Sequence, residues 1–143
     1  MTDQDNIKLA NSFFDGWNAG DLSKARQYES ADTLVEAPGS PTPMNGNQSQ
    51  AYNQNFLTAF PGSKFVILFN VAQGEYVVTN WKITGKNAGP LMSPSGKTIP
   101  PTGKTTTLVG STTSQIKNGK VVHSWSFWDM SSLLGQLGLL PPM

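Results

Sequence analysis

The 143-residue chain has no cysteine and a single histidine, His123. The missing cysteines exclude disulfides, thiolate metal sites and a cysteine nucleophile. One histidine is too few for the histidine clusters that bind zinc, and no Asp-x-Asp-x-Asp spacing indicates a site for a hard cation. We therefore expect no bound metal and a fold whose stability comes from its core alone.

Charge and long apolar runs are also scarce. Charged residues make up 13% of the chain, against about 25% in typical proteins, and the net charge is +1. Without a basic cluster we expect no nucleic-acid partner, and weak self-repulsion favours self-association. No apolar run reaches the ~18 residues of a membrane span. Because residues 1–5 do not resemble a secretion signal, we expect a cytoplasmic protein that does not enter a membrane.

Helices are predicted in the first part of the chain, where apolar residues recur at helical spacing. Ile7, Phe13 and Trp17 lie on one face of the first helix, which stops at Gly20. Asp21 is a suitable N-cap for the second helix. The second and third helices are predicted at Leu22–Tyr28 and Gln48–Ala59, with a short strand at Thr33–Ala37 between them.

Strands are predicted after residue 62, where β-branched and aromatic residues replace the helical spacing. Asn118-Gly119 favours a hairpin turn, and Ser131 is expected to cap a last helical turn. The Pro-, Gly- and Ser-rich segment 89–103 is expected to form a lid or rim over the mouth of a pocket. Helices followed by hairpin-connected strands predict a single α+β domain, 1–143, with an antiparallel sheet and its helices on one face. The predicted strands are Lys64–Ala72, Tyr76–Gly85, Lys104–Ile116 and Val121–Asp129.

Six short motifs occur in a fixed order along the chain. They are Pro38-Gly39-x-Pro41, Ala59-Phe60-Pro61, Pro100-Pro101-Thr102-Gly103-Lys104, Asn118-Gly119-Lys120-Val121-Val122, Trp125-x-x-Trp128-Asp129 and Leu133-Leu134-Gly135-Gln136-Leu137-Gly138. Together they resemble the SnoaL-like polyketide (ester) cyclase family over nearly the whole chain. The resemblance implies a nuclear-transport-factor-2-like fold, a cystatin-like roll in which a cone-shaped sheet and N-terminal helices enclose an apolar pocket.

The same resemblance implies an activity, and the chain departs from it at the positions that matter. Enzymes of the family close a polyketide ring without a cofactor, using an aspartate on the last strand and histidines elsewhere. Ser126 stands at the aspartate position, and Asn87 and Glu36 stand at histidine positions. Of these three, only Glu36 can take up a proton at neutral pH. Glu36 is therefore the predicted base inside the pocket; the alternative is a glutamate at a strand end that faces solvent.

The resemblance and the strand alternation also suggest which residues line the pocket and which face outward. Asp129 is expected to be a cap, because it points away from the face that Ser126 occupies. His123, Trp125 and Phe127 share the outer face, so we expect a homodimer packed through it. The predicted ligand contacts, each of which has a purely structural alternative, are Trp17, Tyr52, Trp81, Met92, Thr112 and Trp128.

Two functions remain open at this stage. The first is a cofactor-free cyclase, isomerase or hydrolase of a small polyketide-like carbonyl or ester compound, with Glu36 as base and Asn87, Thr112 and Ser126 orienting the substrate. The second is a non-catalytic module that binds a small apolar molecule in the same pocket. The position of the Glu36 side chain relative to the pocket separates them.

Overall fold

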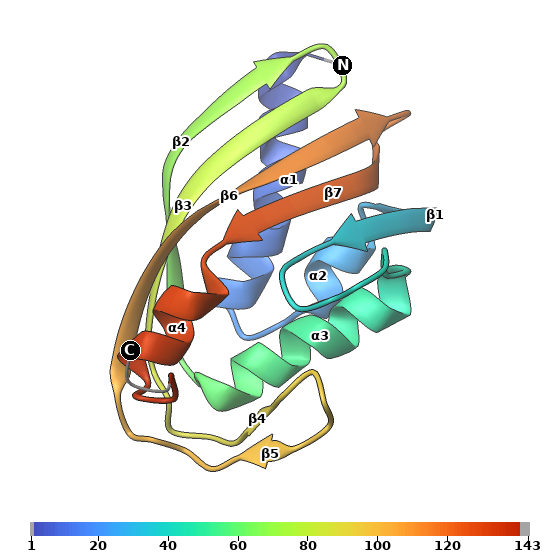
Figure 1. Cartoon of the computed structure of the whole chain (residues 1–143). Coiled ribbons are helices and arrows are strands. Elements are labelled where there is room, and N and C mark those ends of the chain that lie inside the picture. Colours follow the sequence, from blue (N-terminus) through green and yellow to red (C-terminus); the bar gives the residue numbers. More distant parts are fainter. Residues whose placement is uncertain (1, 141–143) are drawn as a thin grey trace.

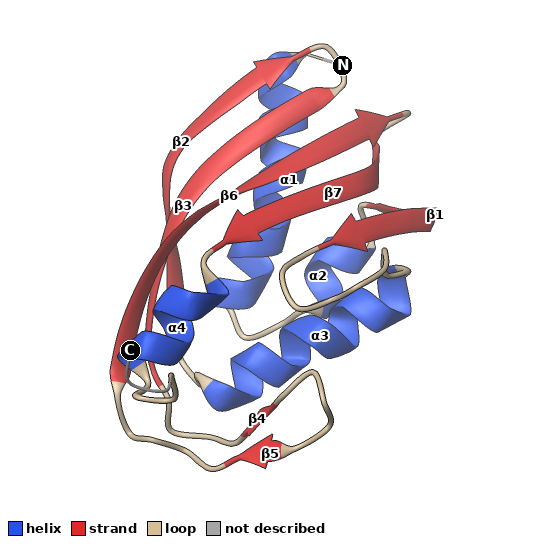
Figure 2. Cartoon of the chain, viewed as in Figure 1, coloured by secondary structure: helices blue, strands red, loops and turns tan. Residues whose placement is uncertain are grey.

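The computed structural model describes residues 2–140 as one curved sheet with helices packed against it (Figures 1 and 2). This arrangement confirms the predicted α+β fold. None of the described helices is long and apolar enough to cross a membrane. The helices are α1 (Asp3–Asn18), α2 (Ser23–Arg26), α3 (Gly46–Ala59) and α4 (Met130–Gln136). The strands are β1 (Glu29–Glu36), β2 (Lys64–Gln73), β3 (Tyr76–Lys86), β4 (Leu91–Met92), β5 (Thr98–Ile99), β6 (Thr105–Lys117) and β7 (Lys120–Trp128).

Capping side chains set where the longer helices begin. At α1, the Asp5 amide donates to Thr2 Oγ1 at 3.1 Å, and the Thr2 amide donates to Asp5 Oδ2 at 3.0 Å. The pair Asn45 and Gln48 makes the same reciprocal contacts at α3, at 2.9 and 2.8 Å. Each pair satisfies two backbone amides that the helix leaves free. Helix α3 therefore begins at Gly46, two residues before the predicted start.

The two short helices differ in detail from the prediction. Helix α2 is a single turn whose N-cap is Leu22, not the predicted Asp21, although Asp21 Oδ1 accepts a hydrogen bond from the Ser23 amide at 3.0 Å. Helix α4 is capped by Asp129, whose Oδ1 atom accepts from the Ser132 amide at 3.1 Å, and not by Ser131. The reason is that β7 ends at Trp128, which leaves Asp129 in the extended conformation that an N-cap requires.

The strand order in the sheet is β1-β7-β6-β3-β2. Strands β2, β3, β6 and β7 are antiparallel neighbours, as predicted. Strand β1 is the exception: it begins at Glu29, four residues before the predicted start, and pairs in parallel with β7. A hairpin forces antiparallel pairing, but β1 is followed by a helix and has no such constraint.

Each strand of the sheet has an inner face toward the helices and an outer face. Along β7, Ser124, Ser126 and Trp128 face inward, whereas His123, Trp125 and Phe127 alternate with them on the outer side. The Phe127 side chain is 67% exposed, as expected, but the Trp125 ring is partly covered because it stacks on His123, with centroids 4.0 Å apart. Val66 and Val109 extend the exposed apolar surface onto β2 and β6.

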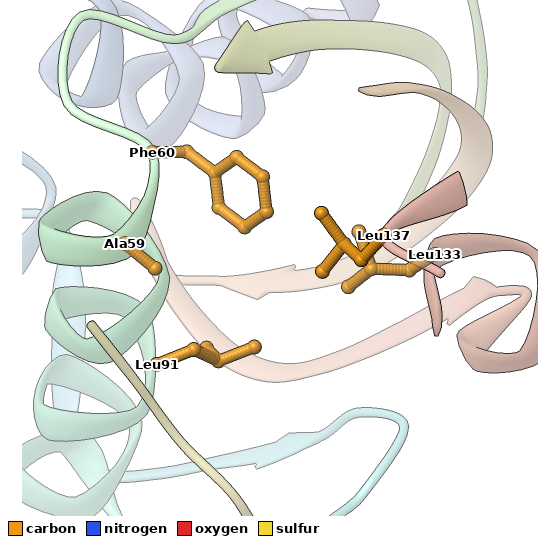
Figure 3. Packing of buried hydrophobic residues seen from close by; sticks show 5 residues of the cluster. All are labelled: Ala59, Phe60, Leu91, Leu133 and Leu137. Atoms are coloured by element: carbon orange, nitrogen blue, oxygen red, sulfur yellow. The ribbon is translucent and has the colours of Figure 1, made fainter. Parts of the chain in front are cut away.

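A cluster of buried apolar residues joins α3, β4 and α4 at one end of the sheet (Figure 3). The amide of Gln136 ties α4 to β6 by accepting from the Thr107 amide at 2.8 Å and donating to its carbonyl at 2.9 Å. Leu91, from segment 89–103, is only 5% exposed and belongs to this cluster. That segment is therefore a packed hairpin of β4 and β5, and none of its residues lines the pocket, so the predicted lid or rim is not supported. The cluster contains Ala59, Phe60, Leu91, Leu133 and Leu137.

The exposed apolar residues of the outer face generate a prediction about assembly. We expect wild-type protein to sediment as a homodimer at tens of micromolar, because burying this surface removes apolar area from water. Phe127→Lys, and separately Val109→Lys, should shift the equilibrium to monomer while the circular dichroism spectrum of the folded chain stays unchanged. A wild-type protein that sediments as a monomer at these concentrations contradicts the prediction.

Candidate functional site

A cavity of about 160 Å³ lies between the inner face of the sheet and the helices. An apolar cavity of roughly 150 Å³ is enough to hold benzene, so this one has room for a single ring or a compound of similar size. Its walls differ in character: the sheet side is rich in hydroxyl groups and the helix side is aromatic. The sheet side includes Trp81, Thr112, Ser114, Ser124, Ser126 and Trp128. The helix side includes Phe13, Phe14, Trp17, Tyr52, Asn53 and Phe56.

The hydroxyl groups form a compact block on β6 and β7. Thr112 pairs with Ser126, and Ser114 pairs with Ser124 in the next inward row. Two residues along a strand span about 7 Å, so the two pairs lie close together on one wall. This block follows from the alternating Ser and Thr pattern of the two strands, but Ser114 and Ser124 were not predicted as site residues.

The first of these pairs forms a short hydrogen-bonded relay with Trp81. The Trp81 Nε1–H group donates to Thr112 Oγ1 at 3.0 Å, and Thr112 Oγ1 lies 2.9 Å from Ser126 Oγ. The two hydroxyls carry two hydrogens, and only one of them can lie between the two oxygens. Whichever way the relay runs, the other O–H group is left to donate into the cavity. The predicted roles of Thr112 and Ser126 as orienting groups fit this geometry.

Gly110 allows this relay to form. It pairs directly with Trp81 across β3 and β6. A Cβ atom at position 110 would lie 2.5 Å from the Trp81 indole ring, closer than any real contact. The missing side chain therefore lets the indole lie across β6 and reach Thr112, two residues further along.

The polar atoms of the aromatic side chains Trp17 and Tyr52 donate hydrogen bonds to other parts of the protein. Trp17 Nε1 donates to Ser63 Oγ at 3.0 Å, and the Tyr52 hydroxyl donates to the Pro38 carbonyl at 2.7 Å. Burial raises the pKa of Tyr52, which keeps the phenol protonated. These residues line the cavity as predicted, and they offer it ring surface and no free N–H or O–H donor.

Glu36 lies outside the cavity. It pairs with the outward-facing Trp125, and its Oε2 atom lies 2.7 Å from His123 Nε2. The Glu36 side chain is 43% exposed and borders a separate depression beside the proline-rich segment 38–43. The prediction of Glu36 as a base inside the cavity therefore does not hold. Strand alternation is the reason, since Val35 takes the inward position.

Asn87 is 1% exposed and acts as a structural link. Its Nδ2 atom donates to the carbonyls of Ala59 and Gly89 at 3.1 and 3.0 Å. Its Oδ1 atom accepts from the amide and the hydroxyl of Thr102, both at 2.9 Å. Because β3 ends at Lys86, Asn87 has left the sheet, and its amide has no free atom for a ligand. The prediction that it orients a substrate is therefore corrected.

Met92 also lies away from the cavity. It is in β4, its side chain is 51% exposed, and its backbone is hydrogen-bonded on both sides to the Asn55 amide group at 2.9 Å. The described cavity-lining residues include none from segment 89–103. The predicted ligand contact at Met92 is therefore not supported, because the segment folds as a hairpin at the end of the molecule.

Glu29 is the site residue that the sequence analysis missed. It is the only carboxylate among the described residues that line the cavity. Burial raises the pKa of the Glu29 carboxyl, and the Arg26 guanidinium, with Nε 3.2 Å from Glu29 Oε2, offsets part of the rise. A strand beginning at Glu29 would have placed it in phase with inward-facing Val35. The strand predicted from the sequence begins at Thr33, so it does not include Glu29 and gives no indication that its side chain faces inward.

The Asn87 link predicts a loss of stability on substitution. Asn87→Leu keeps the branched shape but removes the amide partner of the buried Gly89 carbonyl and of the Thr102 amide, and each unsatisfied group costs about 1–3 kcal/mol. We expect the free energy of unfolding in urea to fall by about 2–4 kcal/mol. Asn55→Leu, which removes two solvent-exposed hydrogen bonds to the Met92 backbone at a half-buried position, is the matched control, and an equal loss in both variants would contradict the assignment.

The raised pKa of Glu29 predicts a pH dependence of stability. The folded chain holds the Glu29 proton more tightly than the unfolded chain, so protonation favours folding. The stability of wild type relative to Glu29→Gln should be highest below the ordinary pKa of 4.5 and should decline as pH rises through the raised pKa. Urea unfolding of both proteins from acidic to neutral pH measures this difference. A difference that grows with pH would have the wrong sign.

Comparisons with known proteins agree with this architecture. The profile of the family described as SnoaL-like polyketide cyclase matches residues 8–137. No curated protein sequence matches the chain significantly. Several solved structures share the fold. AclR of Streptomyces galilaeus, a candidate hydroxylase, has a TM-score of 0.85 at 23% identity, covering 98% of this chain and 100% of its own.

Two other structures carry different names. IdmH of Streptomyces antibioticus, a candidate polyketide cyclase, has a TM-score of 0.79 at 23% identity, covering 93% of this chain and 98% of its own. A Catenulispora acidiphila protein with a ketosteroid isomerase-like fold, solved in complex with trimethylamine, has a TM-score of 0.74 at 14% identity, covering 94% and 97%. At these identities the likeness concerns the fold alone. The profile match over most of the sequence shows that the chain belongs to the SnoaL-like polyketide cyclase family.

Proposed function

We propose that this family member binds a small, mostly apolar polyketide-like compound in its cavity, through a carbonyl or ester oxygen, without acid–base chemistry at that oxygen. The observation that carries the proposal is the unused O–H group of the Thr112–Ser126 pair. A ligand oxygen placed there accepts a hydrogen bond from a relay that Trp81 polarises from behind.

The rest of the cavity suits such a ligand. Trp17, Tyr52 and Phe56 present ring surface opposite the hydroxyl block. Trp128 packs edge-on against Phe56, with centroids 5.6 Å apart, and continues the aromatic lining onto the sheet. Flat, unsaturated compounds gain most from such walls, because aromatic contacts add to the burial of apolar area. A few polar groups within a mostly apolar lining are typical of small-molecule sites.

The catalytic alternative needs a base near the anchored oxygen, and the described residues that line the cavity place none there. Proton abstraction beside a carbonyl needs a base within about 3 Å of the proton. Glu36 faces the outside of the sheet, and Glu29 pairs with Val121, five residues before Ser126 on β7. At about 3.3 Å per residue, that places the Glu29 backbone roughly 15 Å from the relay. The geometry therefore favours binding over a cyclase, isomerase or hydrolase reaction at this position.

A binding experiment with the simple ketone 4-phenylbutan-2-one tests the proposal. We expect calorimetry or NMR titration to show one site in the wild type. Replacing both hydroxyls in Thr112→Val/Ser126→Ala should weaken binding roughly three- to tenfold, since one hydrogen bond contributes about 0.5–1.5 kcal/mol. Both groups must be removed, because either oxygen alone keeps a hydrogen to donate.

Ser111→Ala is the matched control, because it removes a hydroxyl from the outward-facing position next to Thr112 on the same strand. Its affinity should equal that of the wild type. The proposal fails if the wild type does not bind the ketone at millimolar concentration, or if the double variant binds it as tightly as the control.

A further inference from the structure

We infer that Glu29 is a second polar anchor of the cavity, so that the natural ligand has two ends: a carbonyl or ester oxygen for the Thr112–Ser126 pair and a neutral hydroxyl, a phenol or an alcohol, for Glu29. This inference rests on the proposed function and extends it by naming the ligand class.

The pairing of β1 with β7 fixes the position of Glu29. Glu29 is in register with Val121, and the Val121 amide donates to the Tyr28 carbonyl at 2.7 Å. Val121 and Ala25, on α2, line the same end of the cavity. The relay and Glu29 therefore lie toward opposite ends of one continuous space.

The Glu29 carboxylate has hydrogen-bonding capacity that the protein does not use. An ionised carboxylate can accept about four hydrogen bonds. The described residues supply it with none; Arg26 Nε lies 3.2 Å from Oε2 as an ion pair, and Oε2 is shielded from solvent. A buried charge without hydrogen bonds costs free energy, so a donor on the ligand would be favoured at this position.

The other side of the ion pair is closed by α3. A Cβ atom at Gly46 would lie 3.3 Å from Glu29 Oε2 and 3.0 Å from Arg26 Nη2, so the start of the helix packs directly over the pair. Arg26 also donates to Asn47 Oδ1 at 3.0 Å and to Gln50 Oε1. These contacts close the Oε2 side of the carboxylate, so a ligand in the cavity would reach Glu29 through its other oxygen, Oε1.

The ion pair also indicates the charge of the ligand group. Arg26 already balances the charge of Glu29. A ligand ammonium group would add an unbalanced positive charge in a partly buried space, which is costly. A neutral hydroxyl adds a hydrogen bond to a charged acceptor without that cost, and such bonds are stronger than those between neutral groups. A hydroxyl is therefore the better match.

A pair of probes tests the inference: 4-phenylbutan-2-one and its para-hydroxy analogue, which carries a phenol at the end opposite to the ketone. We expect the wild type at neutral pH to bind the hydroxyketone five- to tenfold more tightly than the ketone. In Glu29→Gln this preference should fall at least threefold. In Glu36→Gln, which alters a carboxylate on the outer face of the same strand, it should remain.

The variant of the relay separates the two proposals. Thr112→Val/Ser126→Ala should weaken both probes by the same factor and leave their ratio unchanged. If the wild type binds neither probe, the proposed function fails. If it binds both probes equally, or if Glu29→Gln keeps the full preference, the proposed function stands and the role of Glu29 is overturned.

A measurement on the wild type makes the test independent of whether Glu29→Gln folds. Nuclear Overhauser contacts should join the phenol ring protons to the methyl groups of Ala25 and Val121, and the ketone methyl group to the Trp128 indole. The reverse orientation would overturn the inference, because the phenol would then lie at the relay and away from Glu29.

Discussion

The parallel pairing of β1 with β7 is the constraint on which the chemistry of the cavity depends. Because side chains alternate along a strand, the pairing with β7 fixes which residues at each end of β1 enter the cavity, on either side of a register shift between Glu29 and Leu34. It places Glu29 and Val35 on the inner side and Glu36 on the outer side beside His123. A slip of one residue would exchange these faces and give the cavity a different carboxylate.

The polar groups around the cavity fall into two kinds. Trp17, Tyr52 and Asn87 direct their polar atoms at other parts of the protein, and these contacts hold α1, α3 and the end of β3 in place. The Thr112–Ser126 pair and Glu29 retain capacity that the protein does not use. A buried polar group normally has its partners within the fold, so unused capacity beside a cavity points to a ligand.

Membership of the SnoaL-like polyketide cyclase family fixes the fold more firmly than the reaction. The curved sheet and its helices are shared with proteins named as a candidate hydroxylase and as a candidate cyclase. A common fold can carry different chemistry, because function depends on particular side chains in the site. In this chain Ser126 stands on the last strand where the family resemblance implies an aspartate, and a serine donates or accepts a hydrogen bond but does not act as a base unaided.

The sequence by itself determined the elements and the faces of the antiparallel strands. Helical spacing, the Asn118-Gly119 turn and the alternation along β6 and β7 are local signals, so they predicted the α+β fold and the inward positions of Thr112, Ser126 and Trp128. The tertiary structure alone decided the direction and length of β1, because pairing with a distant strand leaves no local signal. That pairing places Glu36 outside the cavity and Glu29 at its wall. Because β3 ends before Asn87, this residue makes structural hydrogen bonds and does not face the cavity.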